Sequence, residues 1–259
     1  MILQYETEHY IFHYLSGSLT EHDIIKIAEC QENCFEKICR VLEISYPRKI
    51  GYWLYDSPHI IGNIFYDGSP INGISILGDG CDIGRQVSLS GDSENIFVIE
   101  PYSVHAVYED KIKCIGEHED THIISTQISE WSSIFLMEGL AMFMDGVWWK
   151  IDNKAWARYY MEYGEPFSIS DMICFDLDGF YEVDTHISYP IAGAVTEYII
   201  QKYGIEKYKQ FYCADEYVRK AVEIYGVSLD QIHKDFISWL SELDISKDVY
   251  EQIKSQLVQ

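Results

Sequence analysis

The residues best suited to chemistry in this chain are two histidines and a glutamate in the pentad HEDTH, residues 118–122. On a helix, residues four positions apart share a face, so the imidazoles of His118 and His122 can reach one metal ion. Glu119 follows the first histidine directly, where its carboxylate can act on a metal-bound water rather than on the metal. The spacing therefore predicts a zinc hydrolase site carried by a helix.

A catalytic zinc site needs a third protein ligand and leaves its fourth position to water. Glu138 is the candidate, because it is the lone carboxylate in the apolar segment FLMEGLAMF, residues 135–143. A buried carboxylate is costly unless a cation or hydrogen bonds satisfy it. The alternative is a solvent-facing stripe, which the apolar residues three and four positions away disfavour. Gly139, in mid-helix, predicts that another helix or the metal passes close.

Together these motifs resemble the gluzincin clan of zinc metallopeptidases, which includes thermolysin-like and aminopeptidase-N-like enzymes. The resemblance rests on HEDTH followed, after fifteen intervening residues, by EGLA at 138–141. It extends to SYPIAGA at 188–194 and KYG at 202–204, which are similar to the segment that carries the transition-state tyrosine in the aminopeptidase-like branch. The motifs cover about residues 111–204. The implied fold is a zincin-like catalytic domain.

The resemblance also implies a role for each residue. His118, His122 and Glu138 would bind one Zn²⁺ per chain, and no other cofactor is implied. Glu119 would be the general base that takes a proton from the zinc-bound water and passes it to the leaving amine. Tyr189 would donate its hydroxyl to the oxyanion of the tetrahedral intermediate.

Some assignments keep alternatives open. Tyr189 is either the oxyanion donor or an ordinary tyrosine of the core or of a helix start, and His186 is its rival for the oxyanion role. Asp120 places a charge where the clan usually has none; it either faces solvent or hydrogen-bonds a ligand histidine. A GxMEN-like substrate-anchoring segment is absent from the sequence, so aminopeptidase specificity is not predicted.

The predicted function is a zinc-dependent metallopeptidase that hydrolyses peptide bonds in a peptide or protein substrate. One alternative is a non-catalytic, metal-binding module that recognises peptides; a fourth protein ligand closing the zinc site would favour it. Another is a zinc hydrolase of a small non-peptide amide or ester, which a blind pocket would favour. The sequence leaves the oligomeric state open.

Composition narrows the classes of partner and compartment. The chain has 19 Lys+Arg and 42 Asp+Glu, a formal net charge of −23, which disfavours binding to nucleic acid and to anionic membranes. No run of eighteen uncharged apolar residues is present, and residues 1–16 lack a basic region and a cleavage site, so neither a membrane span nor a signal peptide is expected. The odd number of cysteines, seven, without a secretory signal indicates reduced thiols in the cytoplasm. The absence of a CxxC pair disfavours a metal site built from cysteines.

The pattern of elements predicts an α+β fold in which a mixed β-sheet and the active-site helix occupy residues 1–129. A mainly helical subdomain would follow at 130–259, the two forming one catalytic unit. We expect strand 95–100 either to border the cleft and bind an extended peptide, or to be an ordinary sheet strand. The segment DLDG at 176–179 favours a turn over a calcium loop. The other predicted strands are 6–15, 50–55, 73–77 and 86–89, and the predicted helices are 20–46, 111–129, 132–145, 189–203, 205–213, 215–225, 228–243 and 246–257.

Overall fold

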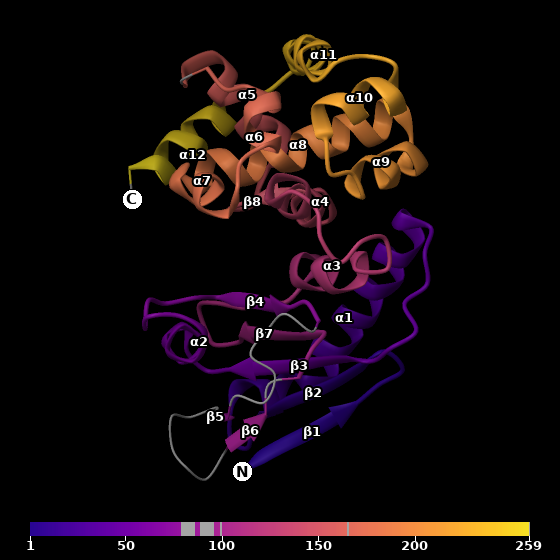
Figure 1. Cartoon of the computed structure of the whole chain (residues 1–259). Helices are drawn as coiled ribbons and strands as arrows, with labels where there is room; N and C mark the ends of the chain where they lie inside the picture. The colour runs from indigo at the N-terminus through magenta and orange to yellow at the C-terminus, as the bar shows by residue number, and fades with distance from the viewer. Residues whose placement is uncertain (79–85, 89–95, 99, 165, 259) are drawn as a thin grey trace. The chain divides into compact units, whose positions relative to one another are not determined.

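The computed structural model describes residues 1–78, 86–88, 96–98, 100–164 and 166–258. The chain divides into two compact units, Met1–Glu130 and Trp131–Gln259. The first combines helices with a mixed sheet and the second is mainly helical, so the predicted α+β class is confirmed (Figure 1).

The first unit is built on a five-stranded sheet in the order β1-β2-β3-β7-β4. The three inner strands are mutually parallel, and the two outer strands, β1 and β4, each run antiparallel to their neighbour. The strands are β1 (Ile2–Glu6), β2 (Tyr10–Leu15), β3 (Ile50–Tyr55), β4 (Gly73–Ile76) and β7 (Ser103–Val107). A separate two-stranded sheet pairs β5 (Gln86–Ser88) with β6 (Ile96–Val98).

Alternation along these strands assigns each residue to one face of the sheet. Helices α1 (Leu19–Leu42) and α3 (Glu117–Ser125) pack against each other and contact one face. The register aligns Phe12, Tyr52, Val104 and Ser75 in a row on that face. Helix α2 (Pro58–Phe65) packs against the other face over a core that includes Trp53, Tyr55, Ile76 and Val107.

The first unit differs from the prediction at several elements. Predicted strand 50–55 is confirmed as β3, whereas predicted strand 6–15 is the second half of a β1–β2 hairpin. Of predicted strand 95–100, the described residues Ile96–Val98 form β6, which pairs with β5 in a separate sheet; the edge strands of the five-stranded sheet are β1 and β4. The predicted helix 111–129 is shorter in the structure, where α3 spans Glu117–Ser125. It begins after Gly116, which has a φ of +141°, a conformation that residues with a side chain rarely adopt.

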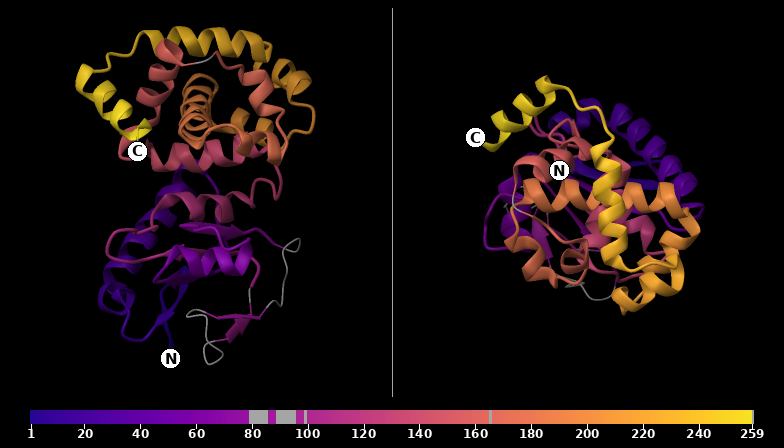
Figure 2. Two further views of the ribbon diagram at one scale, coloured as in Figure 1. Left: turned by 90° about the vertical axis from the view of Figure 1, so that its left-hand side faces the viewer. Right: turned by 90° about the horizontal axis from the view of Figure 1, so that it is seen from above.

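In the second unit, the long helix α8 (Thr185–Tyr203) contacts α4 (Ile134–Asp145) and α5 (Asn153–Tyr163) most extensively (Figure 2). A Cβ on Gly139 would lie 2.8 Å from the Ala192 carbonyl oxygen, and one on Gly193 would lie 2.7 Å from Met142 Cβ. These glycines let the backbones of α4 and α8 approach closely. The expectation that a helix passes Gly139 is confirmed, and that helix is α8.

The rest of the second unit surrounds α8. Its segment at 176–179 is neither a calcium loop nor a simple turn, because Asp176 caps a short helix by accepting a hydrogen bond from the Gly179 amide at 2.9 Å. The remaining elements are β8 (Val147–Trp148), β9 (Ile151–Asp152), α6 (Ile169–Ile173), α7 (Leu177–Glu182), α9 (Ile205–Tyr212), α10 (Tyr217–Tyr225), α11 (Leu229–Ser241) and α12 (Lys247–Leu257).

Two further findings concern the cysteines and the length of the helices. Six described cysteines carry free thiols, and the seventh, Cys81, lies outside the described residues. Among the described helices, none combines the length and the apolar character needed to cross a lipid bilayer.

A row of rings crosses three strands on the α2 face of the sheet. His13 stacks on Trp53 with ring centroids 3.8 Å apart, and Trp53 is stacked with His105 at 6.2 Å. Both histidines are buried, and burial lowers the pKa of His13 to about 4 and that of His105 to about 3. Tyr55 and Ser103 lie within hydrogen-bonding distance of the two ring nitrogens of His105.

The lowered pKa values of His13 and His105 predict that the folded protein loses stability in acid. Below pH about 6.5 the unfolded chain protonates them while the folded chain keeps them neutral, so stability falls as the pH drops from 6.5 toward 4. His13→Phe keeps a stacked ring and removes one titrating group. Its free energy of unfolding, measured with urea between pH 7.5 and 4.5, should depend less steeply on pH, by up to about 1.4 kcal/mol per pH unit below 6.5. Equal slopes for the two proteins would contradict this.

Candidate functional site

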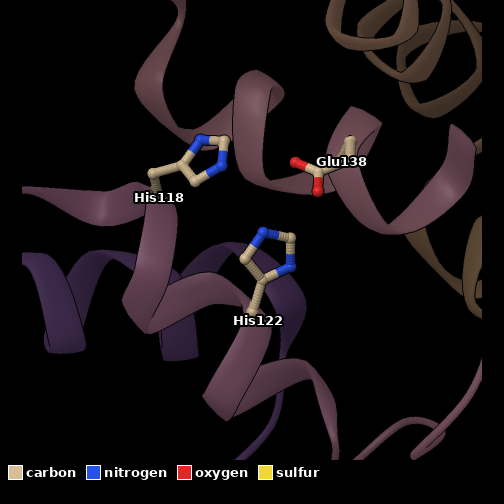
Figure 3. Close-up of side chains that lie close together, drawn as sticks. All are labelled: His118, His122 and Glu138. Carbon is tan, nitrogen blue, oxygen red and sulfur yellow. The ribbon is translucent and has the colours of Figure 1, made fainter. Parts of the chain in front are cut away.

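The two histidines of the pentad lie on one face of α3, as their spacing predicts. Their ring centroids are 5.1 Å apart, with planes inclined at 79° (Figure 3). His122 is buried and His118 is half-buried. Two imidazoles whose side chains lie this close can offer one nitrogen each to a single ion.

Glu119 is held by the edge strand β4. The Ser75 hydroxyl donates to Glu119 Oε2 at 2.5 Å and lies 3.0 Å from the Glu119 carbonyl oxygen. A Cβ on Gly73 would lie 2.7 Å from Glu119 Oε1 and 3.0 Å from the Cys114 sulfur, so the missing side chain leaves room for the carboxylate. Strand alternation places both residues on the α3 face, and together they fix where the Glu119 carboxylate lies.

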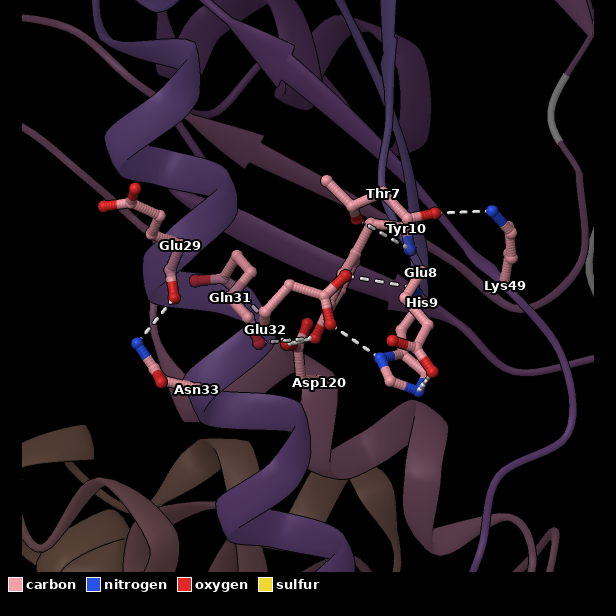
Figure 4. A network of polar contacts seen from close by, with 10 residues as sticks. All are labelled: Thr7, Glu8, His9, Tyr10, Glu29, Gln31, Glu32, Asn33, Lys49 and Asp120. Atoms are coloured by element: carbon pink, nitrogen blue, oxygen red, sulfur yellow. Dashed lines mark hydrogen bonds and ion pairs between the residues drawn. The ribbon is translucent and has the colours of Figure 1, made fainter.

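Asp120 is fully buried and its hydrogen-bond partners are Tyr10 and Gln31, so both expectations for it, exposure to solvent and a hydrogen bond to a ligand histidine, are wrong. The Tyr10 hydroxyl donates to Asp120 Oδ2 at 2.5 Å, and Gln31 Nε2 donates to the same oxygen at 2.8 Å (Figure 4). Burial raises the pKa of this carboxyl well above its ordinary value, while the two hydrogen bonds act in the opposite direction. The carboxyl group that the sequence left unexplained therefore attaches α3 to β2 and α1.

Glu138 lies in α4 with 6% of its surface exposed, so the solvent-facing stripe considered for it is wrong. It sits between buried apolar residues of the same helix, including Phe135, Ala141 and Met142. Tyr181 of α7 donates its hydroxyl to Glu138 Oε1 at 3.2 Å. The buried carboxylate is thus oriented by a tyrosine that the sequence did not single out.

His118, His122 and Glu138 each offer a ligand atom, and these atoms all lie within 4.8 Å of one another (Figure 3). Among the described residues, these three side chains form the group that could hold a metal ion. Two imidazoles and one carboxylate are a donor set found in catalytic zinc sites, which keep a further position for water. The chemistry of these side chains therefore suits a zinc ion.

Tyr189 and His186 lie in the first turns of α8, beside the β8–β9 turn. Tyr189 is half-buried and stacks on Trp148, with ring centroids 5.2 Å apart. His186 is stacked with Trp149 at 6.1 Å, and its Nδ1 lies 3.2 Å from Asp184 Oδ1. Both side chains thus belong to one cluster of aromatic residues.

The sequence did not predict four residues that contact the carboxylates of this region: Gly73, Ser75, Gln31 and Tyr181. The predicted strand 73–77 already implied that Gly73 and Ser75 share a face, but alternation does not say which face meets a helix. Gln31 and Tyr181 lie far along the chain from the carboxylates they contact, and their types carry no signal of their own.

No protein-family model matches this sequence, and no curated protein matches it.

Proposed function

We propose that this chain is a zinc metallopeptidase of the gluzincin type with a zincin-like fold. His118, His122 and Glu138 would hold one Zn²⁺ per chain. When bound, the ion would act as a Lewis acid and lower the pKa of a water toward about 7. Two histidines and a carboxylate supply a donor set suited to that role.

The observation that supports catalysis most strongly is the placement of Glu119. A site that held zinc only for structure would need no carboxylate beside its ligands. Here Ser75 of β4 donates a hydrogen bond to the Glu119 carboxylate, and Gly73 of the same strand leaves space for it. We assign Glu119 as the general base, which takes a proton from the attacking water and delivers it to the leaving amine.

A peptide substrate is favoured by the same strand. Among the described strands, β4 pairs with β7 alone, so its other edge can accept an extended segment through backbone hydrogen bonds. We therefore assign to β4 the binding of an extended peptide that was predicted for strand 95–100. A small amide or ester would gain nothing from such an edge.

Tyr189 remains our assignment for the oxyanion donor, with His186 as its rival. Tyr189 stacks on Trp148, and this contact helps to orient its ring. The Tyr181 hydroxyl already donates to Glu138, so we assign Tyr181 to orienting that carboxylate.

Replacing the proposed base gives the most direct test of catalysis. Glu119→Gln keeps the size of the side chain and removes its capacity to accept a proton. We expect cleavage of a proteome-derived peptide library, followed by mass spectrometry, to fall to background while the zinc content stays at one per chain. Retained cleavage by the variant would contradict the role of Glu119, and absence of cleavage by the zinc-loaded wild type would contradict the proposed function.

The strand contact predicts a graded effect. Ser75→Ala removes the hydrogen bond to the Glu119 carboxylate without touching the proposed ligands. We expect kcat on a cleaved peptide to fall about tenfold, equivalent to about 1.4 kcal/mol, with KM and zinc content unchanged. Ser69→Ala, which alters an exposed serine in the loop before β4, is the matched control and should behave as wild type. Wild-type kcat for Ser75→Ala would show that the contact does not position the base.

A further inference from the structure

We propose that Gln31 of α1, acting with Tyr10 of β2 through Asp120, is a positioning residue that sets the rotation of the helix carrying His118 and His122. This inference rests on the proposed function, since it concerns the helix that would present two zinc ligands. It gives a role to Asp120, a residue of the pentad that the zinc chemistry does not use.

Gln31 is fully buried and uses both ends of its amide on α3. Its Oε1 accepts from the Gly116 amide at 2.9 Å, and its Nε2 donates to the Gly116 carbonyl at 3.1 Å and to Asp120 Oδ2 at 2.8 Å. Gly116 is the N-cap of α3 and, having no side chain, supplies no cap of its own. A residue 85 positions earlier in the chain therefore fixes the start of the helix.

Tyr10 adds a second point of attachment from the sheet. Its hydroxyl donates to Asp120 Oδ2 and lies 3.0 Å from the Gln31 carbonyl oxygen. Tyr10 is itself fully buried on β2. Asp120 is thus held from a strand and from a helix at once, which fixes its position in two directions.

The position of Asp120 within the pentad makes this attachment matter for the ligands. At 100° per residue, Asp120 points about 180° away from the mean direction of His118 and His122. Side-chain atoms lie about 6 Å from the helix axis, so a rotation of about 20° would move the imidazole nitrogens by about 2 Å. That displacement exceeds the tolerance of about 0.5 Å expected of a working site. Fixing the face of α3 that carries Asp120 therefore also fixes the direction of the face that carries His118 and His122.

The neighbouring residue supplies a matched control. Glu32 also joins α1 to the sheet, by accepting from the His9 backbone amide at 3.0 Å and by pairing with the His9 ring at 2.6 Å (Figure 4). Glu32 contacts His9 and Thr7, which both lie in the turn between β1 and β2, and neither residue belongs to α3. Glu32→Gln therefore weakens the attachment of α1 without altering Asp120.

The experiment compares Gln31→Met, Tyr10→Phe and Glu32→Gln with wild type. Hydrogen exchange of the α3 backbone amides is measured in the metal-free proteins at matched global stability, which urea unfolding sets. Zinc affinity is measured by chelator competition, and the visible absorption of the Co²⁺-substituted proteins reports the geometry of the ligands. Tyr10→Phe provides the test should Gln31→Met fail to fold.

We expect Gln31→Met and Tyr10→Phe to exchange faster in α3, to bind zinc about 10- to 100-fold more weakly, and to shift the Co²⁺ spectrum. Glu32→Gln should lose stability while α3 exchange, zinc affinity and the spectrum stay as in wild type. Unchanged exchange and affinity in the first two variants, or equal changes in Glu32→Gln, would overturn the positioning role. If wild type binds no zinc, the proposed function fails, and the exchange measurements still decide whether Gln31 holds α3.

Discussion

The first unit is organised around a carboxylate that lies inside the apolar core. Taking Asp120 out of water is costly unless donors replace its hydration, and Tyr10 and Gln31 provide two donors to one of its oxygens. Those donors come from β2 and α1, so both hydrogen bonds form only when α3 lies against the strand and the helix. The other face of α3 is then available to His118 and His122, and its edge brings Glu119 to β4.

In the second unit, close packing of two helix backbones fixes the position of another buried carboxylate, that of Glu138. Gly139 and Gly193 bring α4 and α8 into close contact, which fixes α4 and with it the buried Glu138. Tyr181 then orients the carboxylate by donating to Glu138 Oε1. Larger side chains at either glycine would separate the two helices, because the nearest atoms include backbone and Cβ atoms that cannot move independently.

The sequence predicted those features that depend on local pattern. The helical pentad, the strand at 50–55, the helix around Glu138 and the close passage at Gly139 all follow from residue spacing and polarity over one or two turns. The start of α3 was misplaced because Gly116 ends the preceding segment, and the strand at 103–107 was missed because every residue in it is buried, which removes the alternation that marks a strand. The contacts of Asp120, Glu119 and Glu138 could not be predicted, since each partner lies between 43 and 110 residues away.

The central claim is that His118, His122 and Glu138 bind one zinc ion and leave a position open to water. X-ray absorption at the zinc edge of the purified, zinc-loaded protein tests it most directly. We predict one zinc per chain, with two imidazole nitrogens and oxygen ligands at about 2.0–2.2 Å and no sulfur. Loss of one imidazole from the spectrum of His122→Ala would complete the assignment. Sulfur ligands at about 2.3 Å, or failure of the protein to bind zinc, would contradict the account.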